Sequence, residues 1–188
     1  MSQGTLYIFS KSPRSNWLGQ LVSELELDIS VEGIENDKFA ANFPLKKAPA
    51  FIDNSGWKLT ETIAIIQYLI SLKESSSLAG NSTKEKAQVL KWLSLFNHDF
   101  IDAAVEILFF AKTDADKKLW IEKGTAILSY ADAFLKYSKL LAADSITIAD
   151  IFVYKVIISI SPLVGGIEPF KNINRWIADV ESIAPAYK

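Results

Sequence analysis

Residues 43–53 read Phe43-Pro44-Leu45-Lys46-Lys47-Ala48-Pro49-Ala50-Phe51-Ile52-Asp53, and residues 58–65 read Lys58-Leu59-Thr60-Glu61-Thr62-Ile63-Ala64-Ile65. The first segment predicts a loop that enters a short strand through Pro49, because proline lacks an N–H and is tolerated at the first residue of a strand. A turn at residues 54–56 should lead into a second short strand. A helix is then expected, with Thr60 as its N-cap.

Two backbone features of this segment could hold a ligand. An X–Pro bond is the place where a cis peptide is tolerated, and a cis Ala48–Pro49 bond would turn the free backbone edge of Ala48 outward. The N–H groups of Glu61 and Thr62 at the helix start would attract a carboxylate. Together they form a plausible clamp for a small peptide. The spacing alone favours a capped helix that merely follows an edge hairpin.

The residues before this segment predict a strand, a helix and a strand. The β-branched and aromatic run 5–9 favours a buried strand. Ser12 is a natural N-cap with Pro13 at the first helical position, and the helix should end near Leu27. Residues 28–31 alternate as a second strand, which the crossover helix should make parallel to the first. Followed by the hairpin and its helix, this is a thioredoxin-like βαβ-ββα domain over residues 1–73.

The second half of the chain is periodic only as helices, which predicts an all-helical C-terminal domain over residues 82–188 after a linker at residues 73–77. Thr147 and Asp150 form a capping box, and the helix over 148–160 is apolar almost all round and should be buried. The other core stripes are expected at Val89, Trp92, Leu93, Phe96, Phe100, Ile107 and Leu108, at Ile121, Ile127, Leu128, Ala131, Phe134 and Leu135, and at Ile173, Trp176, Ile177 and Val180.

Composition excludes several function classes. The 188 residues are 49% hydrophobic and 22% charged with a net charge of −2, so the chain should be globular, and no basic face indicates nucleic acid. Without cysteine there are neither disulfides nor thiolate metal sites. The single His98 has no second histidine to share a metal, so no metal site is predicted. The start of the chain has no signal-peptide pattern and no run is long enough to span a membrane, which indicates a cytoplasmic location.

The sequence Ala48-Pro49-Ala50-Phe51, followed by Leu-Thr-Glu-Thr-x-Ala-Ile at residues 59–65, resembles the glutathione site of the glutathione transferase fold. That fold packs a thioredoxin-like N-terminal domain on a C-terminal helical bundle. The resemblance implies that Ala48, before a cis Pro49, pairs with the backbone of glutathione, and that Glu61 and Thr62 hold its γ-glutamyl end. It also implies that the capping box at 147–150 serves folding. Glutathione is therefore the expected ligand or substrate.

Within that superfamily, residues 1–7 and 43–47 most resemble the N-terminal region of the gamma subunit of fungal translation elongation factor 1B. Such regions dock the nucleotide-exchange subunits and also dimerise, which implies the other subunits of that factor and a second copy of this chain as partners. The full gamma subunit continues through a lysine-rich linker into another domain that is not present here. The chain would then be an isolated domain or a shorter relative.

An active transferase needs a hydroxyl or an equivalent donor aimed at the glutathione sulfur, because the thiolate is the nucleophile. In this fold the donor follows the first strand. Tyr7 and Ser15 are considered there, but Ser10 and Ser12 remain the candidates, although capping would occupy Ser12. Arg14 and Lys47, which follows Lys46, could approach the ligand. The favoured function is a non-catalytic interaction module of the elongation factor 1B type, and the alternative is an active transferase that conjugates glutathione to small electrophiles.

Overall fold

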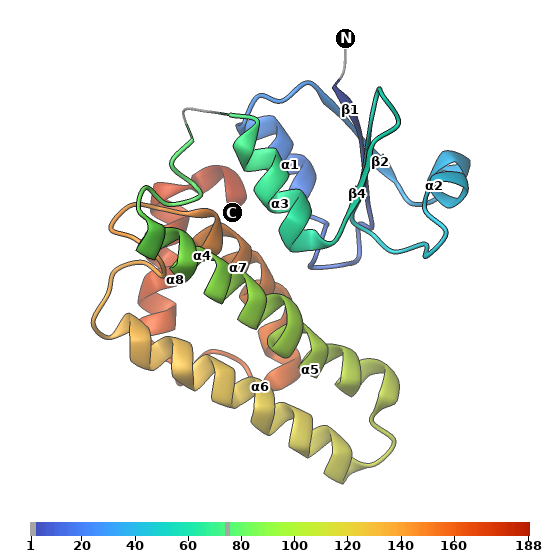
Figure 1. Ribbon diagram of the computed structural model, residues 1–188. Coiled ribbons are helices and arrows are strands. Elements are labelled where there is room, and N and C mark those ends of the chain that lie inside the picture. Colours follow the sequence, from blue (N-terminus) through green and yellow to red (C-terminus); the bar gives the residue numbers. More distant parts are fainter. Residues whose placement is uncertain (1–2, 74–75) are drawn as a thin grey trace. The chain divides into compact units, whose positions relative to one another are not determined.

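The computed structural model describes residues 3–73 and 76–188, and the chain divides into two compact units, Met1–Ser76 and Ser77–Lys188. The first unit contains a sheet with helices, and the second consists of helices (Figure 1). The predicted fold class is therefore confirmed. The linker expected at residues 73–77 includes Glu74 and Ser75, which lie outside the described residues.

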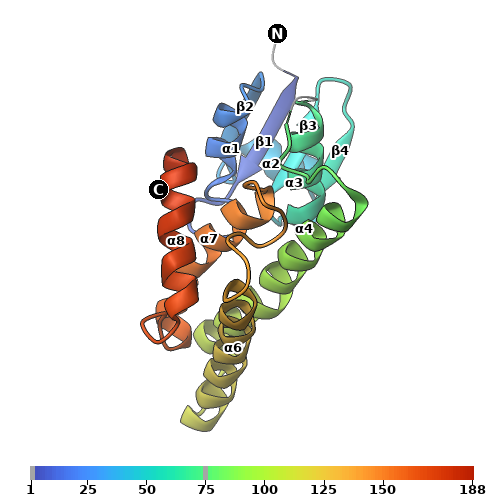
Figure 2. The ribbon, with the colours of Figure 1, turned by 90° about the vertical axis from the view of Figure 1, so that its left-hand side faces the viewer.

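The N-terminal unit contains a four-stranded sheet in the order β2-β1-β3-β4. β1 runs parallel to β2 and antiparallel to β3, as the predicted crossover and hairpin require. α1 and α3 cover one face of the sheet and α2 lies on the other (Figure 1), and β2 is at the outer edge (Figure 2). The elements are β1 Gly4–Ile8, α1 Leu18–Glu24, β2 Ile29–Gly33, α2 Asp37–Asn42, β3 Ala50–Asp53, β4 Lys58–Thr60 and α3 Thr62–Ser71.

The central strands β1 and β3 contribute buried side chains to both faces of the sheet, since successive strand residues point to opposite sides and helices cover both faces. Leu6 in β1 and Phe51 in β3 are completely buried, as are the α3 residues Ile65 and Leu69. On the other face, an apolar cluster joins β1 and β3 to α2 and the loop behind it. Its buried members are Tyr7, Phe39, Phe43 and Ala50. The predicted two-sided burial of the first strand is confirmed.

The prediction that α1 starts at Pro13 with Ser12 as its cap is wrong, because α1 begins at Leu18. Residues 10–17 form turns in which the Ser12 carbonyl accepts from the N–H groups of Ser15 and Asn16. The hydroxyl of Ser15 holds these turns in place, since it accepts from the Phe9 N–H at 3.0 Å and donates to the Phe9 carbonyl at 3.1 Å. The hydrogen bonds of Ser15 to the end of β1 thus keep this segment in turns, and α1 begins five residues later than predicted.

The C-terminal unit is built from four long helices and shorter helical segments. Its elements are α4 Thr83–Leu95, the π-helical turn η1 Phe96–Phe100, α5 Ile101–Val105, a second π-helical turn η2 Glu106–Phe110, α6 Asp114–Leu135, α7 Ile148–Ile160, the 3₁₀ turn η3 Ser161–Val164, α8 Lys171–Ile183 and the 3₁₀ turn η4 Pro185–Tyr187. Most of the predicted core stripe of α4 and η1 is buried, including Trp92 and Phe100. Its extension to Leu108 is wrong, because π-helical turns shift the register and leave this leucine 55% exposed.

The predicted capping box at the start of α7 is confirmed, and its aspartate reaches further than a cap. The Asp150 carboxylate is buried and accepts from the Thr147 N–H at 3.0 Å and from the Thr147 hydroxyl at 2.8 Å. It also accepts from the Leu141 N–H at 2.8 Å and from the Trp176 indole N–H at 3.1 Å. Burial raises the pKa of Asp150, and these donors oppose that shift.

A side chain of α6 accepts hydrogen bonds from backbone N–H groups at the start of α8, and a side chain of α8 donates to a backbone carbonyl at the end of α6. Asp132 in α6 accepts from the N–H groups of Asn172 and Ile173 at 2.8 and 3.0 Å, in the first turn of α8. Arg175 in α8 donates to the carbonyl of Leu135, the last residue of α6, at 2.7 Å, and to the carbonyl of Ser138, just beyond the helix, at 2.9 Å. A negative group thus lies at a helix start and a positive group at a helix end, which the helix dipoles favour.

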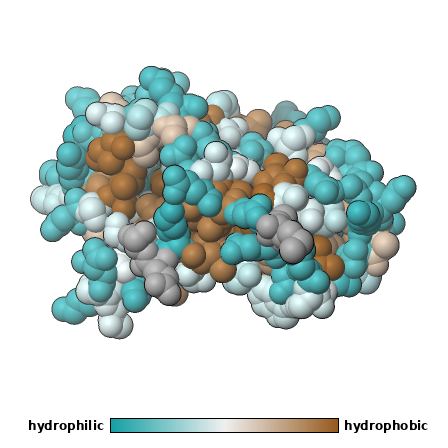
Figure 3. All heavy atoms as spheres, turned by 90° about the horizontal axis from the view of Figure 1, so that it is seen from above, coloured by the Kyte–Doolittle hydropathy of each residue, from teal (hydrophilic) through white to brown (hydrophobic). Residues whose placement is uncertain are grey.

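Hydrophilic side chains cover much of the face shown in Figure 3, with apolar atoms exposed between them. Among the described helices, none combines the length and the apolar character that crossing a membrane requires.

Candidate glutathione site

The loop before β3 has the predicted backbone. The Ala48–Pro49 peptide bond is cis, Pro49 is buried and Ala48 is half-buried. β3 begins only at Ala50, so Ala48 lies outside the ladder with β1 and β4. No backbone hydrogen bond of Ala48 to another described residue is present. Its N–H and carbonyl groups are therefore available to an extended peptide.

The strand register brings three segments to the same end of the sheet. Ala50 lies opposite Thr60 of β4 on one side and opposite Tyr7 of β1 on the other. Both ladders end at these pairs, so the chain leaves β3, β4 and β1 at the same end of the sheet. The cis-proline loop, the start of α3 and the loop after β1 therefore meet there, although they are distant in sequence.

The start of α3 differs from the prediction. Thr60 is the last residue of β4, and Glu61 occupies the N-cap position with φ 72° and ψ 126°. A residue with a side chain rarely adopts a positive φ, and such strain costs about 1–3 kcal/mol and is concentrated at functional sites. Glu61 is exposed and makes no capping bond, whereas Thr62 is buried. Among the described residues, the Thr62 and Ile63 N–H groups find no acceptor.

The loop after β1 carries the predicted hydroxyl donors in different environments. Ser10 is exposed. Ser12 is half-buried, and its hydroxyl oxygen accepts from the Arg14 N–H at 3.3 Å. Ser15 is fully buried and engaged with the Phe9 backbone through both its oxygen and its proton. Because Ser12 only accepts in this loop, its proton remains available to a ligand, whereas that of Ser15 is already used.

Tyr7 is not available to a ligand. It is 2% exposed, and its ring packs against those of Phe39 and Phe43 with centroids 5.5 and 5.9 Å away. Burial, with a smaller contribution from the charge of Glu32, raises the pKa of the Tyr7 hydroxyl. The exclusion of this tyrosine on the basis of its strand pattern agrees with its position.

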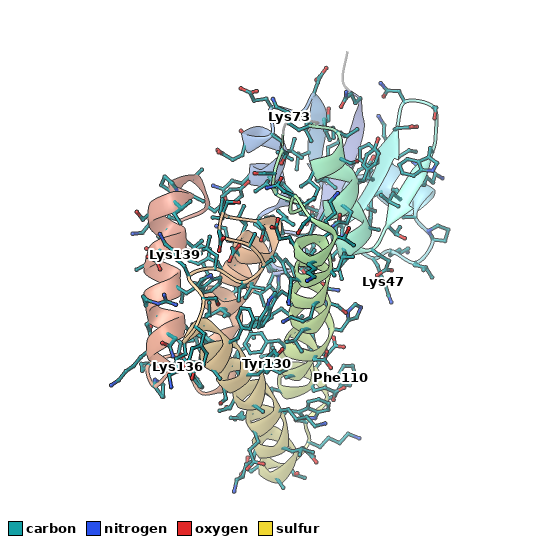
Figure 4. All side chains as sticks on the ribbon, turned by 60° about the vertical axis from the view of Figure 1, so that its left-hand side comes forward. Lys47, Lys73, Phe110, Tyr130, Lys136 and Lys139 are labelled. Carbon is teal, nitrogen blue, oxygen red and sulfur yellow. The ribbon has the colours of Figure 1, made fainter. Side chains whose placement is uncertain are left out.

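The predicted basic residues lie in the two loops that border the candidate site. Arg14 is half-buried in the loop after β1, whereas Lys46 and Lys47 are exposed in the loop before the cis peptide. Figure 4 shows Lys47 beside that loop with its side chain extended outward. A lysine here can move toward a ligand carboxylate, but it is not held in place for one.

No group of metal-ligating side chains occurs among residues 3–73 and 76–188. His98 is exposed, and its Nδ1 lies 3.2 Å from the Ser94 carbonyl oxygen within its own helix. Two features of the site were not predicted. Ser15 supports the loop through hydrogen bonds to the backbone of Phe9, six residues earlier, and the positive φ of Glu61 depends on the path between β4 and α3.

Two family models match the chain: the glutathione S-transferase N-terminal domain over residues 2–71 and the C-terminal domain over residues 90–184. Glutathione S-transferase Y-2 of Pichia kudriavzevii is 32% identical over 183 residues, which cover 96% of this chain and 95% of that protein. Elongation factor 1-gamma 2 of Saccharomyces cerevisiae is 36% identical over 163 residues, which cover 80% of this chain but only 39% of that protein.

Solved structures agree with these matches. A glutathione S-transferase from Pichia kudriavzevii superposes with a TM-score of 0.83 at 40% identity and covers 97% of this chain and 93% of its own. The GST-like domain of elongation factor 1-gamma from Saccharomyces cerevisiae gives a TM-score of 0.82 at 28% identity and covers 100% and 94%. The cis-proline loop and open helix start thus occur in a chain that matches the family in both halves, and the protein belongs to the glutathione S-transferase family.

Proposed function

We propose that this protein binds glutathione where the cis-proline loop meets the start of α3, and that it conjugates the bound thiol to small electrophiles. The observation that carries the proposal is the pair of open backbone positions, at Ala48 and at Thr62, in the two segments that leave the sheet at the same end. An extended peptide can pair with Ala48 while its terminal carboxylate accepts from the N–H groups of α3. Exposed Glu61 can pair with the ammonium group next to that carboxylate.

Conjugation requires the thiolate, because the thiol itself is a poor nucleophile at neutral pH. The Ser12 hydroxyl can donate its proton in a hydrogen bond to the sulfur anion, which lowers the pKa of the thiol and stabilises the attacking form. The thiol proton leaves to solvent, the sulfur forms a bond to an electrophilic carbon, and that carbon releases its leaving group or shifts a π-electron pair. The full-length similarity to a glutathione S-transferase supports this reaction.

The test is calorimetric titration with glutathione together with turnover of an aromatic electrophile such as 1-chloro-2,4-dinitrobenzene. Ser12→Ala should retain binding and reduce kcat by about tenfold or more, since one donor to the anion is lost. Ser10→Ala is the matched control from the same loop and should leave kcat unchanged. If the Ser12 variant keeps full turnover and the Ser10 variant loses it, the donor assignment is wrong. If glutathione does not bind the native protein, the whole proposal fails.

A second candidate is a non-catalytic docking module in an elongation factor 1B complex, as a homodimer or with other subunits. It is supported by the similarity to elongation factor 1-gamma, although this chain spans only 39% of that protein. Saturable glutathione binding with no turnover, together with co-elution with a purified nucleotide-exchange subunit, would favour this candidate. Turnover that depends on Ser12 would favour conjugation.

A further inference from the structure

The two outer strands of the sheet differ in what they offer to a partner. β2 pairs with β1 alone, from Ile29 opposite Gly4 to Gly33 opposite Ile8, so its other side is an unpaired edge within the described sheet (Figure 2). β4 forms the opposite edge but has only three residues and leads almost directly into α3. An edge strand of five residues is long enough to accept an additional strand.

The backbone of Val31 lies at the centre of this edge. In a parallel ladder, every second residue directs both its N–H and its carbonyl toward the neighbouring strand. The Gln3 N–H donates to the Asp28 carbonyl, so Asp28, and two and four residues later Ser30 and Glu32, face β1. Val31 therefore directs its N–H and carbonyl away from the sheet, and its side chain is 38% exposed. An added strand would pair here.

The charges around β2 determine what kind of strand fits. Residues 24–37 contain six acidic side chains and neither lysine nor arginine, although the whole chain has a net charge of only −2. Glu24, Glu35 and Asp37 are exposed. Glu26 is compensated by Lys73 at 2.7 Å, and Glu32 accepts from the Asn36 side-chain amide. Three exposed carboxylates in the segments that flank β2 in the sequence are thus without an ion pair among the described residues.

We propose that β2 is a docking edge for an extended segment of a partner protein that is rich in lysine and arginine. The segment would pair with the backbone of Val31, and its basic side chains would lie near Glu24, Glu35 and Asp37. The same carboxylates repel the β2 edge of a second copy of this chain, which guards the edge against self-pairing. The site is separate from the proposed glutathione site and does not depend on it.

The test uses the full chain and a short fluorescent peptide that alternates lysine and valine, with a glutamate–valine peptide for comparison. Fluorescence anisotropy should detect binding of the lysine peptide only, and added salt should weaken it. The triple variant Glu24→Gln, Glu35→Gln, Asp37→Asn should weaken binding by about fivefold or more. The matched control Glu122→Gln, Asp144→Asn, Glu168→Gln makes the same change in net charge at exposed positions elsewhere and should not.

Hydrogen exchange at the Val31 amide separates strand pairing from general attraction. The amide should exchange rapidly in the free protein and become protected when the lysine peptide binds. Val31→Pro, which removes the donor at an edge position that tolerates proline, should lose binding while the far-ultraviolet circular dichroism stays native. Equal binding of both peptides, an equal loss in the control triple variant, or a protected Val31 amide in the free monomer would overturn the proposal. Concentration-dependent self-assembly through β2 would also overturn it, because the occupant would then be a second copy.

Discussion

The starts of α3 and α7 differ in where their backbone N–H groups find acceptors. At α7, the Ile148 N–H donates to the Leu78 carbonyl at 2.9 Å, and Asp150 gathers donors from three segments of the unit. At α3, no side chain caps the helix, and Glu61 adopts an unfavourable backbone conformation. The first N–H groups of α7 therefore find acceptors within the chain, whereas those of α3 are open to an external carboxylate.

The other long helices resemble α7 in this respect. Glu85 accepts from the Asn81 N–H before α4, Asp116 from the Thr113 N–H at the start of α6, and Asp132 reaches the first turn of α8. A carboxylate of the chain thus lies at every long helix start in the C-terminal unit. The open start of α3 suits the carboxylate of the proposed glutathione ligand, and four variants probe the two regions.

The largest effect is expected at Asp150. Asp150→Ala leaves the Leu141 and Thr147 N–H groups and the Trp176 indole N–H without their acceptor in the core. Unfolding in denaturant should show a loss of about 3–5 kcal/mol, since each buried unsatisfied donor is costly. Asp144→Ala, at an exposed position in the preceding loop, should change stability by less than about 0.5 kcal/mol. Similar losses in both variants would contradict the role of the network.

A smaller loss is expected at Asp132, which serves a helix other than its own. Asp132→Ala removes the acceptor from the first turn of α8 and should cost about 1–2 kcal/mol. Asp132→Asn retains a carbonyl oxygen for these N–H groups and should recover most of the loss. Thermal unfolding of both variants provides the measurement, and an asparagine variant as unstable as the alanine variant would argue against capping.

The third effect is a pH dependence within α7. Tyr154 is buried and donates to Glu181 at 3.0 Å; burial, together with this carboxylate, raises the pKa of its hydroxyl to about 12. Because the folded-state pKa exceeds the unfolded one, its stabilising contribution is complete below pH 10 and is lost as the pH rises toward about 12. Tyr154→Phe should remove up to about 1.4 kcal/mol per pH unit of slope in that window. An unchanged alkaline slope of the unfolding free energy would contradict it.

The smallest effect on stability is expected at α3, and with the opposite sign. Glu61→Gly relieves the positive φ, so the free energy of unfolding should stay constant or rise by up to about 1 kcal/mol. The affinity for glutathione should fall by about tenfold or more, since the carboxylate is lost. Glu122→Gly, on the exposed side of α6, should instead lose about 1 kcal/mol. A destabilised Glu61→Gly variant with unchanged affinity would remove the distinction between the two helix starts.

The sequence predicted those parts of the fold that depend on local pattern. The parallel first strands and the box at Thr147 follow from residue types at fixed spacings, and the structure has both. The cis bond at Pro49 is what the resemblance to the glutathione transferase fold implied, and it is present too. The start of α1 and the cap of α3 could not be predicted in the same way. Ser12 and Thr60 are good caps by residue type, but the hydrogen bonds of Ser15 to the end of β1 and the extent of β4 decide where each helix begins.

Local sequence pattern also could not predict which side chains are exposed at the surface or available in the site. Periodicity extended the core to Leu108, because an ideal helical repeat contains no π-helical turns, whereas η1 and η2 rotate this side chain outward. Ser10, Ser12 and Ser15 look equivalent in sequence. Only their surroundings distinguish an exposed hydroxyl, one whose proton is available and one that is consumed by the backbone of Phe9.

The exchange of end groups between α6 and α8 has a consequence for local unfolding. Asp132 and Arg175 join segments that are 40 residues apart in the chain, and each supplies what the other helix lacks at its end. Neither end can fray alone, because opening the last turn of α6 withdraws groups that hold the first turn of α8. The backbone amides of both turns should therefore exchange with solvent in one cooperative step, although the two turns are far apart in the sequence.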